Sequence, residues 1–307
     1  MKKIAVPVIS GLIGVVFLHQ GALGAAPKPA PSPTPQLRTY VSGLGSDANP
    51  CTVGSPCQTF QRALAMTVAG GAVFVRDSAN YGPATITKAV TITSEGAMAG
   101  VLASSGVGIT INANPADVVT LRGLDIDGGN SGSIGIQFNS GRSLNIQKSL
   151  VHNFSNSGIV FSPTGAGGLF ISDATVSNNT NNGILVAGGA SGATGAFSRV
   201  NASANGVGVF ASGSNVSLAL TDSIASSNNY GIGASLAAVT VRNSTASNNA
   251  VGISADQNAM VRVGQSTVTG NGTGWQATNG GQILSYGNNT VGGNQTDGAA
   301  TTTVTLE

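Results

Sequence analysis

Charged residues are scarce in this chain and make up only 8% of it. Without Lys2 and Lys3, 11 basic side chains remain against 11 acidic ones, so the rest of the chain is formally neutral. A protein that holds nucleic acid by charge needs a basic excess or a basic stripe. The composition excludes such an attraction, and we expect no nucleic-acid partner.

Aromatic residues are also few, at 5% of the chain, and His152 is the only histidine after His19. So few rings argue against a long platform of aromatic side chains stacked on sugars. The low charge does not indicate disorder, because 41% of the residues are apolar and can form a core. The sequence therefore predicts a folded protein with a polar, weakly charged surface.

Only one long apolar run is present, from Ile4 to Leu18, and it is shorter than the roughly 20 residues that span a bilayer. Lys2 and Lys3 precede it and small residues follow it, which is typical of a cleaved export signal rather than of a membrane anchor. We predict a signal peptide over 1–26, a Pro/Ala-rich linker over 27–38, and no transmembrane segment after cleavage. The expected location is secreted, periplasmic or at the cell surface.

Cysteine is limited to Cys51 and Cys57. In an exported chain this pair most simply forms a disulfide that closes a small loop. Metal binding is the alternative, but no histidine or further cysteine accompanies the pair. A helix is expected over Gln58–Val68, where apolar residues have helical spacing and Gly70 follows. Residues 39–72 are therefore predicted to be an N-terminal cap.

Glycine, in contrast, is abundant, with 45 residues. Seven glycines, each followed by an apolar residue, recur along the chain at nearly even spacings of 23, 25, 25, 23, 21 and 22. They are Gly135, Gly158, Gly183, Gly208, Gly231, Gly252 and Gly274. An asparagine lies three to five residues before each of them. A fixed period of this length predicts a stacked repeat architecture.

Each repeat reads as three short strands, because apolar and polar residues alternate and β-branched residues are frequent. A single repeat cannot bury its own apolar face and must stack on its neighbours. We expect asparagine amides to bond from turn to turn and the glycines to let the chain bend. The predicted fold class is all-β: a right-handed single-stranded parallel β-helix of about ten three-strand turns over 73–307, with an N-terminal capping helix.

The first part of the chain also resembles a known family. The residues that carry this resemblance are Tyr40 to Gly43, Asp47 to Cys51, Pro56 to Phe60, Gly71 to Val75, Tyr81 and Ile86 to Ile92. They are similar to the start of secreted right-handed β-helix proteins of the pectate-lyase-like superfamily. The resemblance implies that Phe60 and Leu64 plug the first turn and that carbohydrate, often acidic polysaccharide, is the ligand class. The catalytic motifs of pectate-lyase-like and polygalacturonase-like members are absent from this sequence.

The glycine period aligns one set of charged residues: Asp125, Lys148 and Asp173, at spacings of 23 and 25. Lysine could supply the base that removes a proton next to a sugar carboxylate, and these residues are the predicted catalytic candidates. Asp125, Asp127 and Asp173 could hold a hard cation such as Ca²⁺. The alternative is an exposed ladder of ions with no chemistry. No carboxylate is expected beside His152, so a surface or turn role is predicted for it.

Three functions remain open from the sequence. The first is an exported β-helix that presents a polar surface to glycan, matrix or cell surface without catalysis. The second is a polysaccharide lyase or glycoside hydrolase acting on an acidic polysaccharide in an exterior groove. The third is a structural surface protein. A monomer is expected in preference to an oligomer.

Overall fold

The computed structural model describes residues 1–5, 11, 14, 34–189 and 191–305. Most of the predicted signal peptide and most of the predicted linker lie outside these residues. Backbone contacts divide the chain into two units, Met1–Ser32 and Pro33–Glu307. Every helix and strand among the described residues belongs to the second unit.

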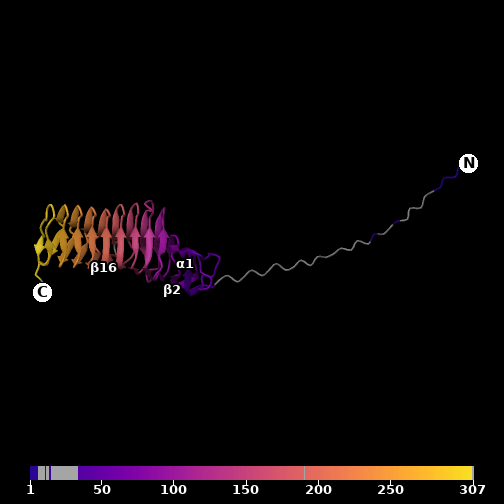
Figure 1. Cartoon of the computed structure of the whole chain (residues 1–307), viewed down its shortest axis with the longest axis horizontal. Helices are drawn as coiled ribbons and strands as arrows, with labels where there is room; N and C mark the ends of the chain where they lie inside the picture. The colour runs from indigo at the N-terminus through magenta and orange to yellow at the C-terminus, as the bar shows by residue number, and fades with distance from the viewer. Residues whose placement is uncertain (6–10, 12–13, 15–33, 190, 306–307) are drawn as a thin grey trace. The chain divides into compact units, whose positions relative to one another are not determined.

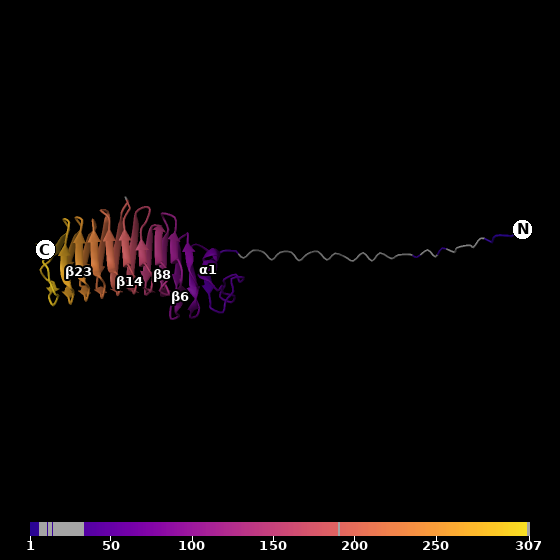
Figure 2. The same ribbon diagram turned by 90° about the horizontal axis from the view of Figure 1, so that it is seen from above.

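The second unit is a coil of short strands in which each strand is hydrogen-bonded to the strands one turn before and one turn after (Figure 1). The pairings between the named strands are parallel, and they form one 20-stranded and one 9-stranded sheet. Seen from above, β6, β8, β14 and β23 follow one another along the coil in chain order (Figure 2). The predicted all-β, parallel β-helix of about ten turns is confirmed.

Three rows of strands run along the coil. The first row is β1 (Gln36–Val41), β2 (Thr67–Val75), β5 (Val90–Thr93), β8 (Val118–Arg122), β11 (Ser143–Gln147), β14 (Gly167–Ser177), β16 (Ala193–Ser203), β18 (Val216–Thr221), β21 (Ala238–Arg242), β24 (Met260–Gly264), β27 (Gln282–Ser285) and β29 (Thr302–Thr303). The second row is β3 (Ala79–Asn80), β6 (Ala99–Leu102), β9 (Leu124–Asp127), β12 (Leu150–His152), β19 (Ile224–Ser226), β22 (Thr245–Ser247), β25 (Thr267–Thr269) and β28 (Thr290–Val291), and β14 and β16 continue into it. The third row is β4 (Ala84–Ile86), β7 (Val107–Asn112), β10 (Ile134–Ser140), β13 (Ser157–Phe161), β15 (Asn182–Ala187), β17 (Val207–Ser212), β20 (Tyr230–Ser235), β23 (Val251–Asp256) and β26 (Thr273–Ala277).

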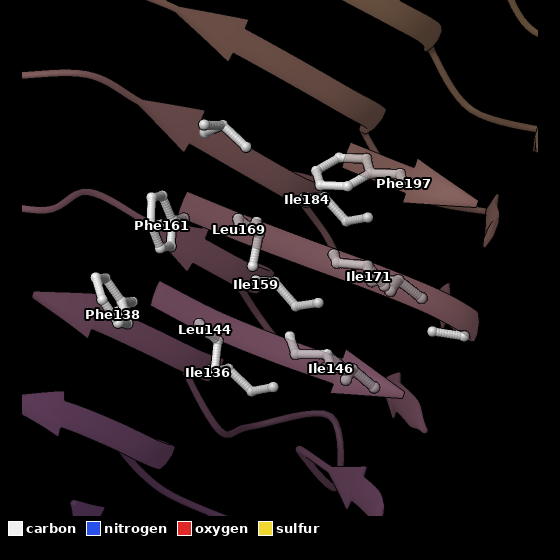
Figure 3. Packing of buried hydrophobic residues seen from close by; sticks show 14 of the residues in the cluster. Ile136, Phe138, Leu144, Ile146, Ile159, Phe161, Leu169, Ile171, Ile184 and Phe197 are labelled. Carbon is white, nitrogen blue, oxygen red and sulfur yellow. The ribbon is translucent and has the colours of Figure 1, made fainter. Parts of the chain in front are cut away.

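The core consists of ladders of like side chains inside the coil (Figure 3). Ile136, Ile159 and Ile184 occupy one register position in successive turns and are fully buried. Phe138 and Phe161 stack one turn apart, with ring centroids 4.4 Å from each other. Because turns repeat at ~4.8 Å, each apolar side chain is covered by its equivalent in the next turn. The repeat therefore builds a continuous core that no single turn could bury.

The repeating glycines are required by the close approach of successive turns rather than by a bend. A Cβ on Gly231 would lie 2.5 Å from the carbonyl oxygen of Gly252 and 2.8 Å from Nδ2 of Asn249. The equivalent glycines meet the next turn in the same way, and none has a positive φ. Our expectation that these glycines bend the chain is therefore wrong. Glycine is required at these positions because the next turn occupies the space that a side chain would need.

A ladder of buried asparagines follows the second row. Its members are Asn179, Asn205, Asn228, Asn249 and Asn271. After Asn179, each side-chain oxygen accepts from the backbone N–H and the amide of the preceding member, as Asn249 does from Asn228 at 2.9 and 3.0 Å. The predicted bonding of stacked amides is confirmed. The residue before a ladder asparagine has a left-handed backbone, as at Asn178 and Asn248, so adjacent asparagines have separate roles.

The N-terminal end of the coil is closed by α1 (Phe60–Met66), and Thr59 caps it by accepting from the backbone N–H of Arg62. Phe60 and Leu64 are buried, which agrees with a plug role, and Phe60 contacts the ring of Tyr81. The helix is shorter than predicted because the backbone is already extended at Thr67, where β2 begins.

Two further buried features lie toward the ends of the coil. Cys51 and Cys57 form the predicted disulfide, and both residues are fully buried. Near the other end, Trp275 is 6% exposed and occupies the register position that Ile253 has one turn earlier. A large buried side chain at this position fills the last part of the core.

Candidate functional site

A column of outward-facing residues marks the corner between the first and second rows of strands. Lys148, Asp173 and Arg199 occupy this corner in successive turns, and all have a left-handed backbone, with φ of 48°, 54° and 52°. One turn before Lys148 the same position is occupied by Gly123. The corner therefore places Lys148 beside Asp173, as predicted, but not beside Asp125.

Asp173 is engaged by the turn that follows it. Arg199 Nε lies 2.6 Å from Asp173 Oδ1, and Nη2 lies 3.0 Å from Oδ2, so the contact is bidentate. These hydrogen bonds, with the charges of Arg199 and Lys148, hold the pKa of Asp173 below its ordinary value. The same hydrogen bonds and the negative charge of Asp173 raise the pKa of Arg199. An ionised carboxylate paired in this way has both oxygens in use, which makes it a poor base and a poor ligand for a cation.

Asp125 is displaced from the corner because the turns differ in loop length. It pairs with Leu150 in β12, two positions beyond Lys148. Between the second and third rows, six residues follow Asp127 but only four follow His152. The repeating glycines Gly135 and Gly158 are therefore 23 residues apart, whereas the paired second-row residues Asp125 and Leu150 are 25 residues apart. Asp125, Lys148 and Asp173 nevertheless line one shallow depression of about 490 Å³.

Two carboxylates flank His152, although we expected none. His152 Nε2 lies 2.9 Å from Asp125 Oδ1, and Nδ1 lies 3.9 Å from Asp127 Oδ1. The histidine side chain is 18% exposed. Alternate residues of a strand point to the same face, so Asp125 and Asp127 both face outward, beside the histidine of the next turn. The Asp-x-Asp pattern one turn before His152 is the sequence signal that we missed.

The predicted cation ligands have other partners. Asp127 Oδ1 accepts from Asn153 Nδ2 at 3.0 Å and from the backbone N–H of Gly129 at 2.9 Å. Asp125 contacts His152, and Asp173 contacts Arg199. In the part of the chain that the structure describes, no group of three His, Cys, Asp or Glu side chains could hold a metal ion.

A second depression lies on the first row of strands several turns further along the coil, with a volume of about 590 Å³. Arg242 and Arg262, on the adjacent strands β21 and β24, line it together with Tyr286. Arg242 Nε donates to Gln265 Oε1 at 2.9 Å. Neither arginine forms an ion pair with any described residue. The ring of Tyr286 lies over Gly264, where a Cβ would meet it at 3.0 Å.

The fold and these exterior depressions define the protein as a parallel β-helix whose candidate sites lie outside the coil. Residues 135–296 match the family model of the right-handed β-helix region, and the chain belongs to that family. No curated protein matches the sequence. Among the described residues, no helix combines the length and the apolar character needed to cross a membrane.

Solved structures share the fold at low sequence identity. The pectate lyase Pel9A is 14% identical, with a TM-score of 0.55 over 82% of this chain and 68% of that one. A complex of XylC with xylose is 9% identical, with a TM-score of 0.64 over 81% of this chain and 68% of that one. A rhamnogalacturonan lyase is 15% identical, with a TM-score of 0.55 over 80% and 75% of the two chains. These similarities establish the architecture alone.

Proposed function

We propose that this protein is exported and binds an acidic glycan on the outer surface of its first-row strands, without cleaving it. The observation that carries the proposal is the depression formed by Arg242, Arg262 and Tyr286. A guanidinium fork matches the two oxygens of a carboxylate, and two forks on adjacent turns can receive a chain of uronate sugars. Export would depend on the predicted signal peptide at 1–26.

The depression offers both contacts that an acidic sugar needs. Gln265 orients Arg242 through a hydrogen bond, and Arg262 is half-buried on the adjacent strand. The ring of Tyr286 lies close to Gly264 and lines the depression, where a sugar ring can stack on it. A volume of about 590 Å³ falls within the usual range for ligand pockets, roughly 300–1,000 Å³. Neighbours named as pectate and rhamnogalacturonan lyases support polysaccharide as the ligand class.

The absence of cleavage is proposed because candidate acid–base groups are far from the arginines. Asn243, the residue after Arg242, occupies the same corner position as Lys148 but four turns later. At ~4.8 Å per turn, the two positions are about 19 Å apart along the coil. A glycan held by Arg242 and Arg262 therefore has its anchored sugars away from Lys148 and His152. Binding energy at one end does not position a proton for removal at the other.

A lyase is the second candidate, and the contact between His152 and Asp125 favours it. A histidine oriented by a carboxylate can remove the proton next to a sugar carboxylate, and a nearby lysine can stabilise the charge that develops. Lys148 and Asp125 line the same depression. Elimination would then break the bond to the leaving sugar oxygen and leave an unsaturated uronate.

Calorimetric titration with polygalacturonate and alginate oligosaccharides tests the leading proposal. We expect binding that weakens with salt and that falls at least tenfold in the double variant Arg242→Ala/Arg262→Ala. Arg142→Ala is the control, because it removes one arginine from an exposed position outside the depression. Equal losses in the control and the double variant, or no binding at all, would overturn the proposal.

An ultraviolet assay for unsaturated uronates separates the two candidates. We expect no product from either polysaccharide with the unaltered protein. Product that disappears in both Lys148→Ala and His152→Ala, while Arg142→Ala retains it, would establish the lyase and refute binding without cleavage.

A further inference from the structure

A third depression lies on the opposite row of strands and differs in chemistry from the two described above. It crosses β17, β20, β23 and β26 of the 9-stranded sheet and has a volume of about 320 Å³. Phe210 and Tyr230 line it together with Asp256, Gln257 and Gln276. Its location on the third row separates it from the arginine depression on the first row.

Phe210 is an aromatic platform at one end of this depression. Its ring lies over Gly233 of the neighbouring strand, where a Cβ would meet the ring at 3.0 Å. Because glycine has no side chain, the ring can lie against the sheet with its other face toward the depression. Tyr230 is 40% exposed and lies on the strand that contains Gly233. Two aromatic side chains on adjacent strands therefore border the space.

Polar groups continue the same surface beyond the ring. Phe210, Gly233, Ser254 and Gln276 occupy one register position in four successive turns, so a hydroxyl and an amide follow the platform at ~4.8 Å steps. Hydrogen bonds from Thr278 and Asn279 hold the pKa of Asp256 below its ordinary value. Both bonds fall on Oδ1, at 2.8 and 2.7 Å, so Oδ2 keeps acceptor capacity for ligand hydroxyls.

The charge of the depression selects against an acidic ligand. Asp256 is ionised, and no lysine or arginine is among the described residues that line the space. A carboxylate or sulfate group would meet a negative charge with no cation to compensate it. Uncharged hydroxyl groups can donate to the carboxylate and exchange hydrogen bonds with the amides, while an apolar sugar face stacks on the ring.

We propose that this surface is a second glycan site, which binds an uncharged sugar ring stacked on Phe210 with its hydroxyls on Asp256 and Gln276. The site does not depend on the proposed binding of acidic glycan, because it uses other strands and the opposite charge. The volume of about 320 Å³ is at the lower end of the usual range for ligand pockets and suits a short stretch of a chain.

Calorimetric titration with xylohexaose, cellohexaose and mannohexaose tests the site. We expect at least one of these neutral oligosaccharides to bind, with a Kd that rises at least tenfold in Phe210→Ala and in Asp256→Asn. Phe210→Tyr should bind as the unaltered protein does, because it keeps the ring. Phe170→Ala is the matched control, since Phe170 is another exposed ring that lies over a glycine, on the first row. Thermal unfolding of each variant checks that the coil is intact.

Three results would overturn the proposal. The first is no binding of any of the three oligosaccharides, and the second is binding that Phe210→Ala leaves unchanged. The third is equal loss of binding in Phe210→Ala and Phe170→Ala. The double variant Arg242→Ala/Arg262→Ala should bind neutral oligosaccharides normally, so failure of this site and failure of the acidic-glycan site give different patterns.

Discussion

The asparagine ladder predicts a large stability difference between two adjacent residues. The side chain of Asn228 is buried and takes part in four hydrogen bonds with neighbouring turns. It accepts from the backbone N–H and the amide of Asn205, at 2.8 and 3.3 Å, and it donates to Ala202 O and Asn249 Oδ1, both at 3.0 Å. Asn228→Ala removes all four bonds and leaves the backbone N–H of Asn205 and the carbonyl of Ala202 without these partners.

The size of the effect follows from the two buried backbone groups that lose a partner. A buried donor or acceptor without a partner costs about 1–3 kcal/mol, whereas a hydrogen bond itself contributes only about 1 kcal/mol. We therefore expect Asn228→Ala to lower the free energy of unfolding by about 3 kcal/mol. Asn229 is exposed, and no hydrogen bond of its side chain is among those of the described residues. Asn229→Ala should change the free energy by less than about 0.5 kcal/mol.

Urea unfolding followed by circular dichroism measures both variants. Stacked repeats can lose cooperativity in unfolding. The comparison therefore requires that the free energy of unfolding have the same dependence on urea concentration in the two variants. A destabilisation by Asn228→Ala that is within about 0.5 kcal/mol of that by Asn229→Ala would refute the reasoning. The ladder would then be a consequence of stacking rather than a source of stability.

Three further predictions concern the glycine column and the cap. Gly231→Ala should destabilise the coil strongly, because the added Cβ would lie 2.5 Å from a carbonyl oxygen of the next turn, and an unchanged thermal midpoint would contradict this. Removing the disulfide in Cys51→Ser/Cys57→Ser should cost about 2 kcal/mol in urea unfolding, and no change would show that the loop is held without it. The hydroxyl of Ser42, the backbone N–H of Gly43 and the hydroxyl of Tyr81 hold the pKa of Asp77 below 3.8. The contribution of Asp77 to stability is therefore present above pH 3.8 and is lost as the pH falls through the lower pKa of the folded state. Asp77→Asn should therefore be less stable than the unaltered protein at pH 7, with a difference that shrinks below pH 3.8, and a difference independent of pH would contradict the assignment.

The fold could be predicted from the sequence because its signals recur from turn to turn. Each glycine equivalent to Gly231 makes the same close contact, and each asparagine equivalent to Asn228 has the same buried amide. A wrong assignment of strands at one turn is therefore corrected by the pattern in the other turns. The capping helix and the disulfide were also predictable, since local spacing is enough to indicate them.

The candidate sites were harder to predict because they depend on the register between unlike segments. The glycine spacing gives the register of the third-row strands only. The loop after Asp127 is two residues longer than the loop after His152, so the second-row strands have a different spacing at this turn. This shift removed Asp125 from the column of Lys148 and placed it beside His152. The platform of Phe210 depends on Gly233 in the following turn, whose role is visible only when the two strands lie side by side.

The close contact between successive glycines also limits how this chain can change in length. Each of these glycines faces a carbonyl of the following turn, so a partial turn inserted anywhere in the column would place a side chain where only a hydrogen fits. Loops between strands can lengthen, as the one after Asp127 does, because they lie outside the column. Duplication of a whole turn preserves every contact and adds a new segment of outer surface. Growth by complete units would thus extend the exterior of the protein without redesign of its core.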